Sequence, residues 1–173
     1  AVVGAAKHRT LSSVHRYHPG AALAPGPTLF IGGNHEASNY LHEHYYGGWA
    51  ARGIYYLGAA GAVRFGGVRI GGLSGIYKRH DYRSGRPEAP PFDNGSVRSC
   101  YHQRELDVRM LLSLSARRRR GDARDARGGE RAGGAVALDV GLSHDWPARV
   151  TDHGDVARLL RAKDHFRDDI ARG

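Results

Sequence analysis

The sequence predicts a mixed α/β (α+β) fold in one domain. Its 173 residues are enough for one domain with a real core. Short apolar runs that stop at glycines or polar residues indicate strands, and longer segments with helical periodicity lie between them. A composition of 40% hydrophobic and 25% charged residues is typical of a soluble globular protein. No apolar stretch approaches the roughly 18 residues of a membrane span, so we expect no membrane partner.

The predicted strands are short. The first covers residues 28–31, where Thr-Leu-Phe-Ile stops at two glycines, and the second covers 54–57. Residues 62–65 and 68–73 flank Gly66-Gly67, which predicts a two-residue β-hairpin. The last predicted strand, 136–142, is apolar throughout, so we expect a buried strand.

Helices are predicted at 37–42, 97–115 and 155–171. Residues 1–27 have no clear periodicity and contain the turn signal Pro25-Gly26-Pro27. Residues 74–96 form a long polar and aromatic loop, and such a loop inside a compact domain is usually functional or disordered.

Charge is concentrated in one stretch. The net charge of the chain is +9, and residues 116–134 contribute +4 of it, with seven arginines against three acidic residues. Their Arg/Gly/Ala/Asp composition predicts a disordered, low-complexity insertion. Basic charge makes a polyanionic partner such as nucleic acid plausible, although a solubilising surface explains it equally well. The lone Cys100 excludes an internal disulfide and favours an intracellular reducing compartment.

Two pairs of polar residues follow predicted strands. Asn34-His35 comes after the first strand and His144-Asp145 after the last. Oxygen and imidazole donors at neighbouring strand ends can converge on one divalent cation. A free imidazole beside the cation can protonate a departing alkoxide. A single histidine in such a position more often has a structural role than a catalytic one. Because two such pairs follow strand ends, a metal site and a structural role are about equally plausible here.

Longer stretches resemble a known family. Gly-Asn-His-Glu after a strand resembles the signature of the calcineurin-like metallophosphoesterases. Together, "TLFIGGNHEASNYL", "GGWAARGIYYLGAAG", "VRFGGVRIGGLSGIYKRHDYR", "VRSCYHQRELDV" and "LSHDWP" resemble the RNA lariat debranching enzymes. The resemblance runs from about residue 7 to 167 and is interrupted by the arginine-rich insertion. It implies a metallophosphoesterase-like β-sandwich flanked by helices.

The resemblance also implies an activity. The family hydrolyses the 2′-5′ phosphodiester at the branch point of excised intron lariats in the nucleus, with two divalent metal ions (Fe, Zn or Mn). Asn34 and His144 match an oxygen and an imidazole ligand of one of these ions. His35 matches the histidine that meets the scissile phosphate and protonates the leaving 2′ oxygen.

Residues 74–104 resemble the lariat-recognition segment of the family. Aromatic residues there would stack on bases around the branch, and basic residues would hold phosphates. We expect His80 and His102 to contact sugar or phosphate. For each arginine a solvated surface charge is the alternative, and for Tyr101 a core helix position. The substrate-binding candidates are Tyr77, Lys78, His80, Asp81, Tyr82, Arg83, Arg98, Tyr101, His102 and Arg104.

Three family motifs are not found in this chain. They are an early Asp/Cys-x-His, a following Gly-Asp, and a late Gly/Ala-His-x-His. Two protein ligands cannot hold a pair of metal ions, so we expect a domain that is incomplete at both ends and inactive as given. Two alternatives stay open. One is another metallophosphoesterase acting on small phosphodiesters, and the other is a catalytically dead RNA-binding remnant.

Overall fold

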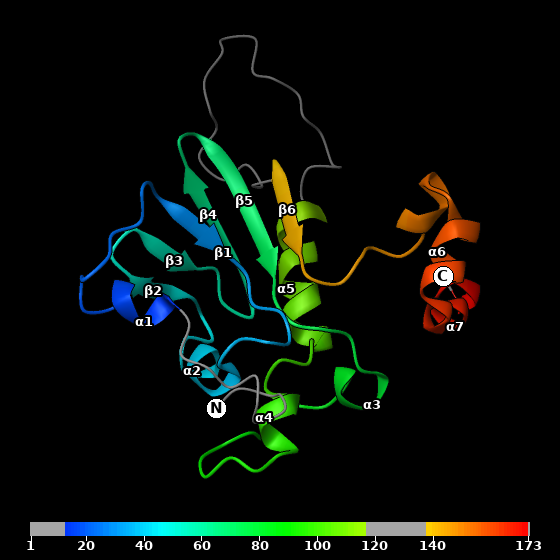
Figure 1. Ribbon diagram of the computed structural model, residues 1–173, viewed down its shortest axis with the longest axis horizontal. Coiled ribbons are helices and arrows are strands. Elements are labelled where there is room, and N and C mark those ends of the chain that lie inside the picture. Colours follow the sequence, from blue (N-terminus) through cyan, green and yellow to red (C-terminus); the bar gives the residue numbers. More distant parts are fainter. Residues whose placement is uncertain (1–12, 117–137, 173) are drawn as a thin grey trace.

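The structure, a computed structural model, describes residues 13–116 and 138–172. Two three-stranded sheets lie side by side, and helices flank them (Figure 1). This arrangement confirms the predicted mixed α/β class. The predicted insertion at 116–134 and the start of the strand predicted at 136–142 lie outside the described residues, apart from residue 116.

The first sheet has the order β1-β3-β2. β1 (Thr28–Phe30) pairs in parallel with β3 (Ile54–Tyr56), and β2 (Gly48–Ala51) pairs antiparallel with β3. β1 and β3 confirm two predicted strands. β2 was not predicted, because Gly-Trp-Ala-Ala shows no alternation of apolar and polar residues.

The second sheet has the order β4-β5-β6. β4 (Ala60–Phe65) and β5 (Val68–Leu73) form the predicted hairpin, in which Phe65 lies opposite Val68. Both turn glycines have positive φ, 55° at Gly66 and 85° at Gly67, as a type I′ turn requires. β6 (Val140–Ser143) pairs in parallel with β5.

The sheets share a core near their adjoining ends. Leu57, directly after β3, is 2% exposed. Gly72 of β5 lies so close to Leu57 and Ile31 that a Cβ there would come within 2.7 Å of each side chain. The long helix α5 (Glu105–Ala116) contacts both β4 and β5, and Figure 1 shows it behind the second sheet.

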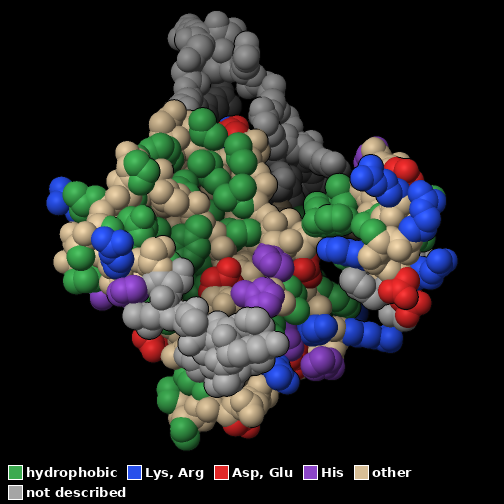
Figure 2. Space-filling view, in the orientation of Figure 1, with side chains coloured by type: hydrophobic (Ala, Val, Ile, Leu, Met, Phe, Trp, Pro, Cys, Tyr) green, Lys and Arg blue, Asp and Glu red, His purple; other side chains and the backbone are tan. Residues whose placement is uncertain are grey.

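Some apolar surface of the sheets stays open. Phe65 is 51% and Val68 40% exposed, and Figure 2 shows hydrophobic side chains spread over this region. The prediction of a buried strand at 136–142 is wrong for its described part, since Val140 is 41% exposed. The described residues do not cover this side of β6.

The remaining helices are short. The segment predicted as one helix at 97–115 contains α4 (Ser96–Ser99) and α5, separated because residues after Cys100 leave the helix to pair with Ile76. The predicted C-terminal helix is likewise divided at Lys163, whose backbone is extended (φ −146°, ψ 80°). The other helices are α1 (Val14–Tyr17), α2 (Ser38–Glu43), α3 (Arg79–Tyr82), α6 (Val156–Ala162) and α7 (Arg167–Arg172), with 3₁₀ turns η3 (Val150–His153) and η4 (Asp164–Phe166). Within the described ranges, no helix has the length and apolar character needed to cross a membrane.

Candidate metal and RNA site at the strand ends

The turn after β1 is fixed by the segment that follows β5. The Gly32 N–H donates a hydrogen bond to Ser74 Oγ (3.1 Å), and the Gly75 N–H donates to Gly32 O (2.8 Å). Ser74 Oγ in turn donates to Gly58 O at 2.6 Å. These bonds join the ends of both sheets and hold the backbone that leads into Asn34.

The carboxylate of Glu36 closes this turn. It accepts hydrogen bonds from the backbone N–H groups of Gly33 (2.8 Å) and His35 (3.2 Å). The Asn34 side chain is half-buried and the His35 side chain is exposed. Sequence reasoning assigned Glu36 no role, although its place in the Gly-Asn-His-Glu signature was a signal for one.

The structure brings His144 to the same turn. Its imidazole lies against Gly33, where an added Cβ would come within 2.5 Å of Nε2. The side chain is 41% exposed, and Nδ1 lies 3.4 Å from Oδ1 of Asp145. The ends of β1 and β6 therefore meet, as the strand-end pattern predicted. Figure 2 shows histidine and acidic side chains gathered on the face below the sheets.

Asp145 connects the strand end to residues 74–104. Its Oδ2 accepts a hydrogen bond from the Tyr77 N–H at 2.6 Å, across 68 positions of sequence. This contact could not be predicted from the sequence, because nothing local links the two positions.

A small cavity lies beneath the turn. Its volume is about 30 Å³, and Gly32, Glu36, Ser74 and Arg86 are among its lining residues. That volume has room for a water molecule or two but for no nucleotide. Any ligand as large as a nucleotide could reach this turn only from the exposed side, where His35 and His144 lie.

Several predicted RNA contacts are exposed to solvent. Tyr77 is 51% exposed, and its ring lies 5.3 Å from that of the half-buried Tyr82. The Arg83 side chain is 87% exposed and only 3.9 Å from Glu105. Lys78 and Arg98 are also exposed. Exposed aromatic rings together with exposed cations are the combination that binds single-stranded nucleic acid.

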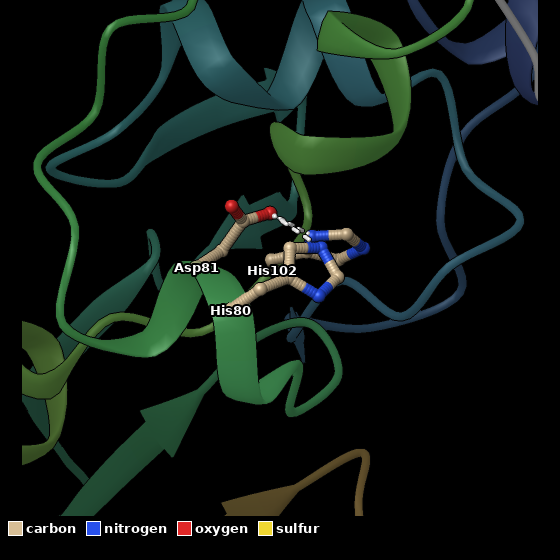
Figure 3. A group of neighbouring side chains, drawn as sticks. All are labelled: His80, Asp81 and His102. Atoms are coloured by element: carbon tan, nitrogen blue, oxygen red, sulfur yellow. Dashed lines mark hydrogen bonds and ion pairs between the residues drawn. The ribbon is translucent and has the colours of Figure 1, made fainter.

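Three further candidates form a compact cluster (Figure 3). Oδ2 of Asp81 lies 2.5 Å from Nδ1 of His102 and 3.5 Å from Nε2 of His80. Among the described residues, these form a group whose donor atoms could hold a metal ion. Burial lowers the pKa of the His102 imidazole, and the hydrogen bond from His102 holds the pKa of Asp81 below its usual value. Tyr101, half-buried, packs its ring edge-on against His102 at 5.2 Å.

Arg104 does not lie on the exposed surface. Its side chain is 3% exposed and bonds Glu88 Oε1 at 2.5 Å, Gly85 O at 2.9 Å and His102 O at 3.1 Å. The expectation of a direct phosphate contact is therefore wrong in this structure, because a buried guanidinium must be paired within the protein. Arg104 instead holds the loop that carries His102.

A second buried ion pair supports the same loop. Arg86 pairs with Asp107, which is 1% exposed, and Tyr45 donates a hydrogen bond to Asp107 at 2.7 Å. The Arg86 guanidinium lies over the Tyr45 ring, 5.1 Å from its centroid. Burial raises the pKa of the Tyr45 hydroxyl. Sequence reasoning missed the cluster of Arg86, Asp107 and Tyr45, because charged residues in a polar loop usually face solvent.

Curated proteins similar to this chain are lariat debranching enzymes. The chain is 50% identical to that of Arabidopsis thaliana over 164 residues, which cover 95% of the chain and 34% of the relative. It is 44% identical to that of Homo sapiens, again over 95% of the chain but 26% of the relative. For Schizosaccharomyces pombe the identity is 43% over 96% of the chain and 32% of the relative. No protein-family model matches the chain.

The chain thus spans about a third or less of the length of the curated relatives that it matches. The matched stretch covers almost all of this chain, so the strand-end motifs and residues 74–104 lie within it. Over 95% of its length, the chain is homologous to the lariat debranching enzymes.

Proposed function

We propose that the protein containing this chain hydrolyses the 2′-5′ phosphodiester at the branch point of RNA lariats, and that it acts in the nucleus, where such RNA arises. The observation that carries the proposal is the contact of His144 with Gly33, beside Asn34 and His35. This contact brings the end of β1, which is followed by an amide oxygen donor, next to the end of β6, which is followed by an imidazole donor.

The donors fit divalent cations of the Fe, Zn or Mn kind. Asn34 offers an amide oxygen and His144 an imidazole nitrogen, a combination that these metals accept. Asp145, 3.4 Å from Nδ1 of His144, can orient the ring and leave Nε2 for the metal. Two donors are fewer than a metal site ordinarily needs, so further ligands must complete a site for two ions. When bound, such ions would activate a water molecule and neutralise charge at the phosphate.

In this proposal, His35 transfers the proton. Its backbone is held by Glu36 while its side chain is exposed on the side from which a phosphodiester can approach. An imidazole without a ligand role can donate a proton to the leaving 2′ oxygen at neutral pH.

Residues 74–104 provide the RNA-binding surface in this proposal. Tyr77 and Tyr82 would stack on bases near the branch, and the half-buried Tyr101 would offer a third ring. Lys78, Arg83 and Arg98 would contact phosphates. The bond from the Tyr77 N–H to Asp145 holds this surface next to His144, which suits a substrate that must reach both.

A segment exchange tests the proposal. The corresponding 164 residues of the Arabidopsis thaliana relative would be replaced by those of this chain, so that the relative supplies any remaining ligands. We expect the hybrid to cleave a branched RNA at its 2′-5′ bond with added Mn²⁺ and to leave linear RNA intact. Cleavage of bis(p-nitrophenyl) phosphate without cleavage of branched RNA would favour a small-phosphodiester enzyme instead. Binding of branched RNA without any cleavage would favour an inactive RNA-binding protein.

A further inference from the structure

We propose that His80, Asp81 and His102 form a site for one divalent transition-metal cation, and that the site prefers Zn²⁺. The site uses none of the strand-end donors, and the inference does not rest on the proposed function. Two of its residues come from α3 and the third from the loop before α5 (Figure 3).

The backbone holds the two parts of the site together. Ile76 and His102 form a parallel β-bridge. The Ile76 N–H donates to Tyr101 O at 3.0 Å, and the Gln103 N–H donates to Ile76 O at 2.9 Å. The amide side chain of Gln103 adds a bond to Gly75 O at 3.1 Å. The backbone at His102 is therefore fixed next to the segment that leads into α3 before any ion binds, which lowers the ordering cost of binding.

The donor atoms have nearly the spacing of a metal site. All three lie within 4.8 Å of one another. In a tetrahedral site with bonds of about 2.0–2.1 Å, donors lie about 3.3 Å apart. The 3.5 Å between His80 Nε2 and Asp81 Oδ2 matches this spacing. The widest pair needs to move by about 1.5 Å at most, and the side chain of His80 is 73% exposed, which leaves room for its ring to turn. Asp81 Oδ2 and His102 Nδ1, now hydrogen-bonded at 2.5 Å, must separate by about 0.8 Å, and His102 must give up the proton that it shares with Asp81.

Ligand chemistry selects the ion. Two imidazoles and one carboxylate suit Zn²⁺, whereas Mg²⁺ and Ca²⁺ prefer oxygen donors throughout. Three protein ligands leave a fourth position for water. The ion has a path to the site, since the side chains of His80 and Asp81 are 73% and 22% exposed while that of His102 is 9% exposed.

A metal ion bound by these three side chains would connect α3 to the loop before α5. The span between the two histidines contains Arg83 and Arg98, both exposed. A bound cation would then fix the ends of this span. The two histidines would also be ligands of the ion, and so unavailable as direct contacts to RNA.

The test measures Zn²⁺ and Co²⁺ binding to the full chain by calorimetry and by the visible absorption of Co²⁺. A background variant, Asn34→Ala with His144→Ala, removes the strand-end donors. In this background we expect one equivalent of metal, and we expect His80→Ala and Asp81→Asn each to weaken binding at least about tenfold. His153→Ala, at an exposed histidine in η3, is the matched control and should bind as the background does.

Thermal unfolding gives an independent readout. Zn²⁺ should raise the Tm of the background and of the His153→Ala chain but not that of His80→Ala. Absence of binding in the background, or equal binding by His80→Ala and His153→Ala, would overturn the site. Because the strand-end donors are absent from these variants, neither result depends on whether the segment-exchange hybrid cleaves branched RNA.

Discussion

The imidazole of His144 lies against Gly33, leaving no space for a side chain at position 33. The His144 ring is the flexible and partly exposed partner in this contact, so it is the group that must yield to any added atom. The glycine thereby sets how closely the ends of β1 and β6 approach each other.

Gly33→Ala should displace His144 while leaving the fold intact. We expect metal affinity at the strand-end donors to fall at least about tenfold, with a change in unfolding free energy within about 1 kcal/mol. Calorimetry and urea unfolding of the segment-exchange hybrid, which supplies any further ligands, separate the two effects, with Asp81→Asn as background. Gly141→Ala is the control, since nothing lies within 4 Å of a Cβ there. Equal affinities of the two variants would show that the contact does not position His144.

Asn34 and His35 should have separable roles in the segment-exchange hybrid. Asn34→Ala should lower metal content, because it removes an oxygen donor. His35→Ala should keep the metal and lose about 10²–10⁴-fold in rate, the usual scale of general acid–base assistance. The loss should shrink on a branched substrate with a more acidic 2′ leaving group, which needs no proton. Metal analysis and single-turnover cleavage would decide. Loss of metal from His35→Ala would contradict the proton-donor role.

Breaking the Arg104–Glu88 pair should destabilise the fold strongly. Both side chains are buried, at 3% and 2% exposure. Arg104→Ala leaves a buried carboxylate without its partner, and we expect a loss of about 3–5 kcal/mol in urea unfolding. Arg109→Ala removes a guanidinium whose i,i+4 pair with Glu105 is exposed, and should cost under about 1 kcal/mol. A small effect at Arg104 would mean that its charge is not needed in the core.

Arg83 and Arg98 should contribute to the salt dependence of RNA binding. Each phosphate contact on a single strand adds about 0.7 to the slope of log affinity against log salt. Arg83→Ala with Arg98→Ala should therefore lower the slope by about 1.4, measured by fluorescence anisotropy on branched RNA. Arg52→Ala with Arg64→Ala removes the same charge from exposed positions elsewhere. If both double variants lower the slope equally, only the net charge matters.

Cys100 should react slowly with thiol reagents. Burial raises the pKa of this thiol to about 11, and the thiolate is the reactive form. The rate of alkylation in the folded chain should keep rising up to about pH 11, whereas in urea it should level off near pH 9. The unfolded chain holds fewer protons between these pH values, so the folded state should lose stability there as pH rises. A plateau near pH 9 in the folded chain would refute the shift.

Local patterns predicted the elements whose cause is local. The Gly66-Gly67 hairpin followed from the positive φ that its turn demands, and the strand ends followed from apolar runs that stop at glycine. The break between α4 and α5 could not be predicted, because its cause is the pairing of His102 with Ile76, 26 positions away. The same holds for Arg104, whose burial depends on Glu88 in a loop without periodicity. Short-range patterns do not carry information about which distant polar groups will pair.

The hydrogen bond from Tyr77 to Asp145 has a thermodynamic consequence. A ligand that displaces Tyr77 must also change the surroundings of Asp145, whose other oxygen lies 3.4 Å from His144. If RNA binds at Tyr77 and a metal ion at His144, as proposed, the two binding equilibria are linked. If bound metal changes the affinity for RNA by some factor, bound RNA changes the affinity for metal by the same factor. Under the proposed function, this hydrogen bond would therefore make binding of RNA depend on binding of metal, and binding of metal depend on RNA to the same extent.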